Sequence, residues 1–298
     1  MIFVVAIDPE SIRSCAASGE FGADHLIGIL LALQQNCLLA EICGTWRISE
    51  ELKQAVKSIP DQNTRKKASA ILEDILSPSR YRLVEVIRGF EDDYDTLIGK
   101  ILSSQTSNEN LDVIICETDG DHGNIEFSKI GRFNQSNFAR IRSQRACALI
   151  HAPGTEMAEN VLKTAFGRLI AHSDSISIYD RVMGKDFGDN YFHALGHWCR
   201  FFRQSERKLA VRFHTTQGQE RRIRTKLSNE LEDSGVSFDV IGHDEGEQPH
   251  ERFLRACGFT LDIGRGIDLF DKSGQCRDVK IGLSDHGAFT RDWRHLGD

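Results

Sequence analysis

The 298-residue chain is long enough for two domains, and its composition, 40% hydrophobic and 27% charged, is that of a globular protein rather than a disordered or fibrous one. No apolar stretch is long enough to cross a membrane, and the opening MIFVVAIDPE is unlike a secretion signal, so we expect a cytoplasmic protein. The eight cysteines form no CxxC pair, which indicates reduced, structural thiols rather than a zinc or redox site.

The net charge of -7 is unevenly distributed along the chain. Residues 1–125 contain 20 acidic and 11 basic side chains, whereas residues 126–298 contain 24 and 26. This asymmetry supports two domains, which we place at residues 1–150 and 151–298, because Pro153 and Gly154 mark a plausible boundary. An acidic half can simply be well solvated, but carboxylates that follow strands can also hold cations.

Strands and helices alternate through the first half. Apolar β-forming runs predict strands at residues 2–7, 37–40, 82–87 and 113–116. Helical periodicity predicts helices at residues 22–33, 49–59 and 63–76, and a further helix that Asp95 opens. This order predicts an α/β fold with a parallel sheet that helices cover on both faces.

Acidic side chains follow these strands or begin a helix. The candidate metal ligands are Asp8, Glu41, Asp92, Asp95, Asp119 and Asp121, and Asp8, Glu41, Asp95 and Asp119 are the candidate catalytic residues. Ligands of open α/β sheets bind beyond the carboxyl ends of the strands, and clustered carboxylates require a cation. Mg²⁺ or Mn²⁺ held there would support phosphodiester hydrolysis. Each acid taken alone could instead be a solvated loop or cap residue.

The spacing of these acids resembles a known family. Asp8 after the first strand, Glu41 after the second, Asp95 in DTLIGKIL and the segment VIICETDGDH together look like the PIN-domain nucleases, over about the first 125 to 145 residues. The resemblance implies a metal-dependent ribonuclease. It leaves open whether Asp119 or Asp121 supplies the last ligand.

The second half continues the alternation after the boundary. We predict strands at residues 175–180, 209–214 and 236–241, and helices at residues 155–171, 190–203 and 221–232. This pattern indicates a second α/β domain. Its densest basic stretch, between Arg200 and Lys226, is either a solvated helix face or a surface for nucleic acid or anionic lipid.

Three motifs of the second half resemble another family. SISIYD, Asn190, and His250-Glu-Arg252 followed by FTLDIGRGIDLF look like the phospholipase-D-like C-terminal domain of MIT-domain proteins of membrane trafficking and cytokinesis. Phospholipase-D chemistry uses a His nucleophile and a cationic clamp, normally supplied twice as HxK. The chain has no second copy of this motif, so we expect His250, Arg252 and Arg265 to bind phosphate without covalent catalysis.

Together these features predict a two-domain metal-dependent nuclease. The first domain would cut RNA or DNA, and the second would bind substrate, ligand or partner, as in a bacterial toxin or an antiviral, phage-defence effector. RNA is the expected nucleic acid, and a homo-oligomer or a partner protein is compatible with the sequence. The alternative is a non-catalytic adaptor that binds nucleic acid, anionic lipid or another protein.

Overall fold

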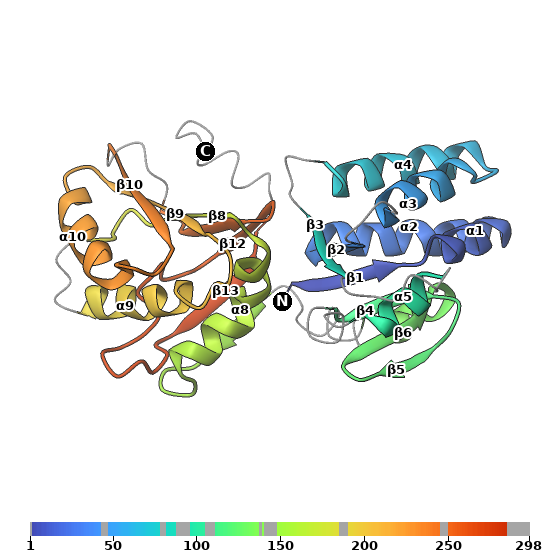
Figure 1. Ribbon diagram of the computed structural model, residues 1–298. Helices are drawn as coiled ribbons and strands as arrows, with labels where there is room; N and C mark the ends of the chain where they lie inside the picture. Colours follow the sequence, from blue (N-terminus) through green and yellow to red (C-terminus); the bar gives the residue numbers. More distant parts are fainter. Residues whose placement is uncertain are drawn as a thin grey trace. The chain divides into compact units, whose positions relative to one another are not determined.

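The computed structural model describes residues 2–42, 47–77, 82–87, 96–104, 111–136, 139, 148–184, 190–244 and 250–284. The chain divides into two units, Ile2–Ala146 and Cys147–Asp298, and each unit has its own β-sheet and helices (Figure 1). The protein is therefore α/β in both halves. Within the ranges just given, no helix is both long and apolar enough to span a membrane.

The sheet of the first unit has the strand order β3-β2-β1-β4-β6-β5. Its strands are β1 (Phe3–Ile7), β2 (Cys37–Ile42), β3 (Leu83–Ile87), β4 (Val113–Cys116), β5 (Gly120–His122) and β6 (Ile125–Lys129). All neighbouring pairs are parallel except β5 and β6, which are antiparallel. The sheet is thus mixed and not wholly parallel as predicted. Strand β5 was not predicted because all three of its residues are exposed and it has no apolar pattern.

Strands β1 and β4 form the centre of this sheet. The side chains of β4 are all buried, as are those of β1 after its first residue, so both strands are covered on two faces. The continuous apolar runs VVAI and VIIC are what a strand of this kind requires. The predicted strands at residues 2–7 and 113–116 therefore lie at the buried centre of the sheet, next to the equally buried β2.

Helices α1 to α4 pack against one another, and α5 is separate from them (Figure 1). The bounds are α1 (Pro9–Ala17), α2 (Gly19–Asn36), α3 (Ile48–Lys57), α4 (Gln62–Ile75), α5 (Leu97–Ser103) and the 3-10 helix η2 (Ile130–Gln135). Helix α4 begins at Asp61, whose carboxylate accepts the Thr64 N–H at 2.6 Å. Helix α5 begins at Thr96, whose hydroxyl accepts the Gly99 N–H at 3.1 Å, so its cap follows the predicted Asp95 by one residue.

The sheet of the second unit is also mixed, with the order β10-β9-β8-β11-β12-β13-β7. Its strands are β7 (Ala148–His151), β8 (Ser175–Tyr179), β9 (Ala210–Thr216), β10 (Ser237–His243), β11 (Phe253–Ala256), β12 (Phe259–Asp262) and β13 (Val279–Leu283). Strands β8, β9 and β10 are parallel, and β11, β12, β13 and β7 continue from β8 in antiparallel pairs.

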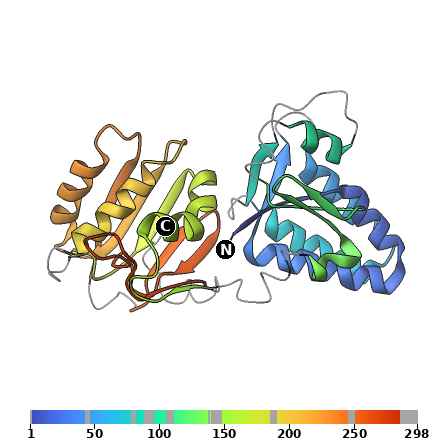
Figure 2. The same ribbon diagram turned by 90° about the horizontal axis from the view of Figure 1, so that it is seen from below.

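Helices α8 (Ala158–His172), α9 (Asn190–Phe202) and α10 (Glu220–Leu231) lie beside one another on this sheet, as both ribbon views show (Figure 2). Trp198 of α9 is fully buried between them, with ring centroids 5.1 Å from Phe166 and 5.9 Å from Phe202. Its indole N–H donates to the Ile267 carbonyl at 3.1 Å, so the loop after β12 is tied to the core.

Candidate active site

The strand order of the first sheet fixes where a ligand would bind. From β1 the chain builds β2 and β3 on one side, and β4 and β6 on the other. The order therefore reverses between β1 and β4, and the crevice beyond the carboxyl ends of two such strands is the usual binding position in open α/β sheets. Asp8 follows β1 at this point, and its N–H donates to the Ile115 carbonyl of β4 at 2.8 Å.

Asp8 is half-buried at the start of α1. Its carboxylate caps the helix by accepting the Glu10 N–H at 3.3 Å, the only hydrogen bond to it within the described chain. Burial raises the pKa of Asp8, and the nearby charges of Glu10 and Glu117 raise it further. The cap aspartate of α4 behaves oppositely, because the N–H of Thr64 lowers the pKa of the exposed Asp61. Asp8 is thus a helix cap whose ionised form is disfavoured by its surroundings.

Glu117 is the first residue after β4, so it and Asp8 follow the two strands on either side of the reversal point. Its exposed carboxylate is close enough to contribute to the raised pKa of Asp8. Two pockets adjoin these acids. One of about 400 Å³ is lined by Asp8, Glu51 and Thr96, and one of about 370 Å³ is lined by Glu117 and residues of α1, α2 and η2. Open space therefore lies beside each carboxylate, in two separate pockets.

Glu41 has a different position from the one expected of a metal ligand. It is fully buried in β2, and its carboxylate accepts the backbone N–H groups of Ile48 at 2.6 Å and Ser49 at 3.1 Å. These are donors of the first turn of α3, which has no side-chain cap from its own N-cap residue, Arg47. Glu41 thus serves as a capping anion for α3, held there by the helix dipole as well.

The acids after Glu117 are also engaged or distant. Asp119 accepts the Lys129 N–H at 2.9 Å and pairs with Arg132 at 3.2 Å, and Asp121 is exposed on β5. The predicted ligands Asp92 and Asp95 lie outside the described residues. Thr96, which follows Asp95 in the sequence, lines the same pocket as Asp8.

Asp8 and Glu117 have the chemistry that Mg²⁺ or Mn²⁺ requires, because both offer carboxylate oxygens and a cation would relieve their repulsion. In the described part of the chain, no three His, Cys, Asp or Glu side chains are grouped so that they could hold a metal ion. The complete ligand set therefore stays a prediction. Sequence reasoning passed over Glu117 in favour of Asp119 and Asp121, although Glu117 is the acid nearest the strand end.

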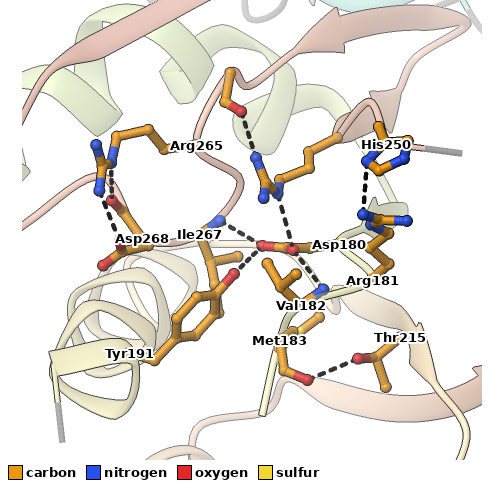
Figure 3. Close-up of polar contacts among 12 residues, drawn as sticks. Asp180, Arg181, Val182, Met183, Tyr191, Thr215, His250, Arg265, Ile267 and Asp268 are labelled. Carbon is orange, nitrogen blue, oxygen red and sulfur yellow. Dashed lines mark hydrogen bonds and ion pairs between the residues drawn. The ribbon is translucent and has the colours of Figure 1, made fainter. Parts of the chain in front are cut away.

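The second unit has a buried carboxylate at an equivalent position. Asp180 follows β8, is fully buried, and accepts the N–H groups of Val182 at 3.1 Å and Ile267 at 3.0 Å and the Tyr191 hydroxyl (Figure 3). Arg252 forms an ion pair with it at 3.3 Å. Burial raises the pKa of Asp180, and its charge contributes to raising the pKa of Tyr191. The Asp180 carboxylate thus holds the loop after β12 at the end of β8.

The predicted phosphate ligands all have partners inside this unit. Arg252 pairs with Asp180 and donates to the Gly264 carbonyl at 2.7 Å, and His250 accepts from Arg181 at 2.6 Å. Arg265 pairs with Asp268 at 3.3 Å. Figure 3 shows Arg265 and His250 on opposite sides of Asp180, so these two side chains do not meet on one ligand position in this arrangement.

Several cations of the basic stretch are paired with acids as well. Arg207 pairs with Asp174 at 3.5 Å, Arg224 with Asp239 at 2.7 Å and Lys226 with Glu230 at 2.7 Å. Exposed pairs such as these contribute little to stability, and nucleic acid can replace them at small cost. The stretch remains a candidate surface for a polyanion.

Known proteins do not settle the family. No family model matches this sequence, and no curated protein matches it either.

Proposed function

We propose that the first unit is a metal-dependent nuclease that hydrolyses phosphodiester bonds of RNA, or of DNA, at the carboxyl ends of β1 and β4. The observation that carries the proposal is that Asp8 and Glu117 follow β1 and β4, the two strands between which the strand order reverses. Burial and mutual repulsion raise the pKa of Asp8 there. A carboxylate with a raised pKa at the ligand-binding edge of a sheet is typical of a functional group.

The residues have distinct tasks in this proposal. Asp8 and Glu117, with Asp95 as the predicted further ligand, would hold Mg²⁺ or Mn²⁺, which when bound activates water and stabilises the charge of the displaced oxygen. The Glu10 N–H holds the Asp8 carboxylate in place. Asp119, two residues after Glu117, accepts the Lys129 N–H and pairs with Arg132, which connects the turn after β4 to η2.

The test compares two cap aspartates. Asn caps a helix about as well as Asp, so Asp8→Asn and Asp61→Asn should both fold. We expect Asp8→Asn to lower the Mg²⁺- or Mn²⁺-dependent cleavage of a labelled single-stranded RNA by at least about a hundredfold, because it removes a charged ligand. Asp61→Asn should cleave like the wild type. Equal activity in the two variants, with both folded, would remove Asp8 from the site.

A non-catalytic adaptor is the second candidate. In the second unit, Arg252 is already paired with Asp180, and Arg265 and Arg277 are paired with Asp268, which favours this role for that unit. A protein of this kind would bind divalent cations no better than its Asp8→Asn variant. Titration calorimetry with Mn²⁺ separates the two, since the nuclease proposal requires that the variant lose Mn²⁺ binding.

A further inference from the structure

The second unit contains a histidine that packs against a turn from a distant part of the chain. His197 lies on α9, is half-buried, and contacts the turn at residues 271–275. Its ring stands edge-on to the buried Phe270, with centroids 5.8 Å apart, and a Cβ at Gly274 would lie 2.6 Å from its Cε1 atom. The turn therefore approaches the imidazole at a distance that only glycine permits.

The position of the proton on this imidazole follows from its partner. The guanidinium of Arg200, one turn later on α9, lies 2.6 Å from His197 Nδ1. A guanidinium can only donate, so Nδ1 accepts, and the ring is neutral with its proton on Nε2. The ring also hydrogen-bonds to the backbone of Asp271 in the turn. A second proton on Nδ1 would face a donor with a donor and a cation with a cation, so protonation of His197 breaks its contact with Arg200.

The turn that packs on His197 also supports the start of α8. Met157, the N-cap residue of α8, provides no side-chain cap, and the Ala158 N–H donates instead to the Gly274 carbonyl at 2.7 Å. The Cys276 N–H donates to the Glu156 carbonyl at 2.7 Å. A first-turn donor of α8 thus finds its acceptor in the turn. Movement of the turn away from α9 would therefore loosen the beginning of α8.

The surroundings of His197 on the helices oppose its protonation. Burial lowers the pKa of this ring, and the charges of Arg200 and of His193, one turn earlier on α9, lower it further. Helix α10 brings Glu230 near Arg200, but this acid is already paired with Lys226 at 2.7 Å. The neutral ring is therefore the form that this contact favours.

The turn itself carries Asp271 and the exposed Lys272. Asp271 acts against the other causes and raises the pKa of His197. The hydroxyl and the N–H of Ser273 donate to the Asp271 carboxylate, at 2.6 and 2.8 Å, and lower its pKa. Asp271 thus stays ionised over the range in which histidines titrate, so the charge that changes between the turn and α9 is that of His197.

We propose that His197 is a pH-sensitive switch between α9 and the 271–275 turn, closed when the ring is neutral and opened by its protonation. When it opens, the turn withdraws its support from the Ala158 N–H, and the start of α8 loosens in the same step. Because the folded chain binds this proton more weakly, the stability from the contact is present above about pH 6.5, the pKa of an unfolded histidine, and is lost as pH falls below it. The switch belongs to the second unit and does not depend on the proposed nuclease.

The first experiment follows the proton directly. The Cε1–H resonance of His197 is titrated by NMR in the full chain, and we expect a midpoint below about pH 6.5. Arg200→Met should raise this midpoint, because it removes the cation that faces Nδ1. Arg203→Met, which removes an arginine that donates to the Glu230 carbonyl, should leave it unchanged. A wild-type midpoint at or above 6.5, or one that Arg200→Met does not move, would overturn the inference.

The second experiment measures the opening. Hydrogen–deuterium exchange, corrected for the intrinsic rate at each pH, is compared at pH 7 and pH 5.5. We expect the protection of Ala158 and of the 271–275 turn to fall by roughly threefold to tenfold at the lower pH, the loss of one hydrogen bond. The protection of β9 should stay the same.

Two variants of His197 remove the proton and keep part of the contact. His197→Phe keeps a ring against the turn, and His197→Gln keeps an acceptor for Arg200, so both should exchange alike at the two pH values. His193→Phe is the matched control, because His193 is an exposed histidine of the same helix, and it should keep the wild-type difference. A difference that persists in both His197 variants, or that disappears in His193→Phe, would show that another group senses the pH.

Discussion

Asp8 and Asp180 are a natural pair to compare, because each follows a parallel strand of its own sheet. The Asp8 N–H donates to Ile115 of the neighbouring strand at 2.8 Å, and the Asp180 N–H donates to His214 at 3.0 Å. Each carboxylate also accepts the N–H of the residue two positions on. Burial raises the pKa of both. Asp8 and Asp180 thus make the same two hydrogen bonds with the backbone around them.

Their surroundings differ in what satisfies the charge. Asp180 is fully buried, with Tyr191, Ile267 and Arg252 added as partners, whereas Asp8 is half-buried and lines an open pocket with Glu51 and Thr96. A carboxylate at a strand end therefore has a structural role when the chain itself supplies its hydrogen-bond donors and its counter-ion. It is a candidate functional site when these partners must come from a bound ligand or cation.

The largest effect on stability is expected when the Asp180 carboxylate is removed. Asp180→Ala leaves the buried Tyr191 hydroxyl and Ile267 N–H without their acceptor and the partly buried Arg252 without its counter-ion, which together should cost about 3–5 kcal/mol. We expect hydrogen–deuterium exchange to rise strongly across β8 and α9, and much less in the first unit. Asp8→Ala should cost only about 1 kcal/mol, the loss of a helix cap. Similar losses in the two variants would contradict the contrast between them.

A smaller effect should follow from filling the space beside Asp180. Gly266 has a φ of +71°, and a Cβ there would lie 2.0 Å from Asp180 Oδ2. Gly266→Ala should therefore cost about 2–3 kcal/mol through backbone strain and displacement of the carboxylate. Chemical denaturation measures this free energy of unfolding.

Gly218→Ala is the matched control, because Gly218 has a φ of +91° and a Cβ there would meet nothing within 4 Å. It should cost about 1 kcal/mol, from strain alone. Equal costs at the two glycines would show that the close approach to Asp180 does not contribute.

The elements of the central sheet could be predicted because their information is local. The runs at residues 2–7 and 113–116 correspond to β1 and β4, and Asp8 follows directly from the first of them. The hairpin of β5 and β6 was missed, since Gly120, Asp121 and His122 are all exposed and carry no apolar alternation.

The roles of the acids depended on contacts that spacing does not encode. Glu41 caps α3 only because the fold brings Ile48 and Ser49 to the end of β2. Arg132, which pairs with Asp119, follows it by thirteen residues. The partners of Asp180 come from as far away as Arg252 and Ile267. A sequence shows which residues can carry charge at a strand end, but not which of them the rest of the chain will neutralise.

The smallest effect we expect is a difference in sign between the two cap aspartates of the first unit. The raised pKa of Asp8 means that the folded chain holds this proton more tightly than the unfolded chain, so its contribution to stability is present at low pH and is lost as pH rises through the folded pKa. The pKa of Asp61 is lowered, so its contribution is present at neutral pH and is lost as pH falls.

Asp8→Asn should therefore raise the Tm at pH 7, because it removes a strained charge, and Asp61→Asn should lower it. Both differences should shrink near pH 3, and thermal unfolding at the two pH values measures them. Mn²⁺ should raise the Tm of the wild type and of Asp61→Asn, since a bound cation stabilises the folded state, and leave Asp8→Asn unchanged. A Tm that falls in both variants at pH 7 would make Asp8 an ordinary cap, as Asp61 is, and would remove the disfavoured charge from which the proposed active site was inferred.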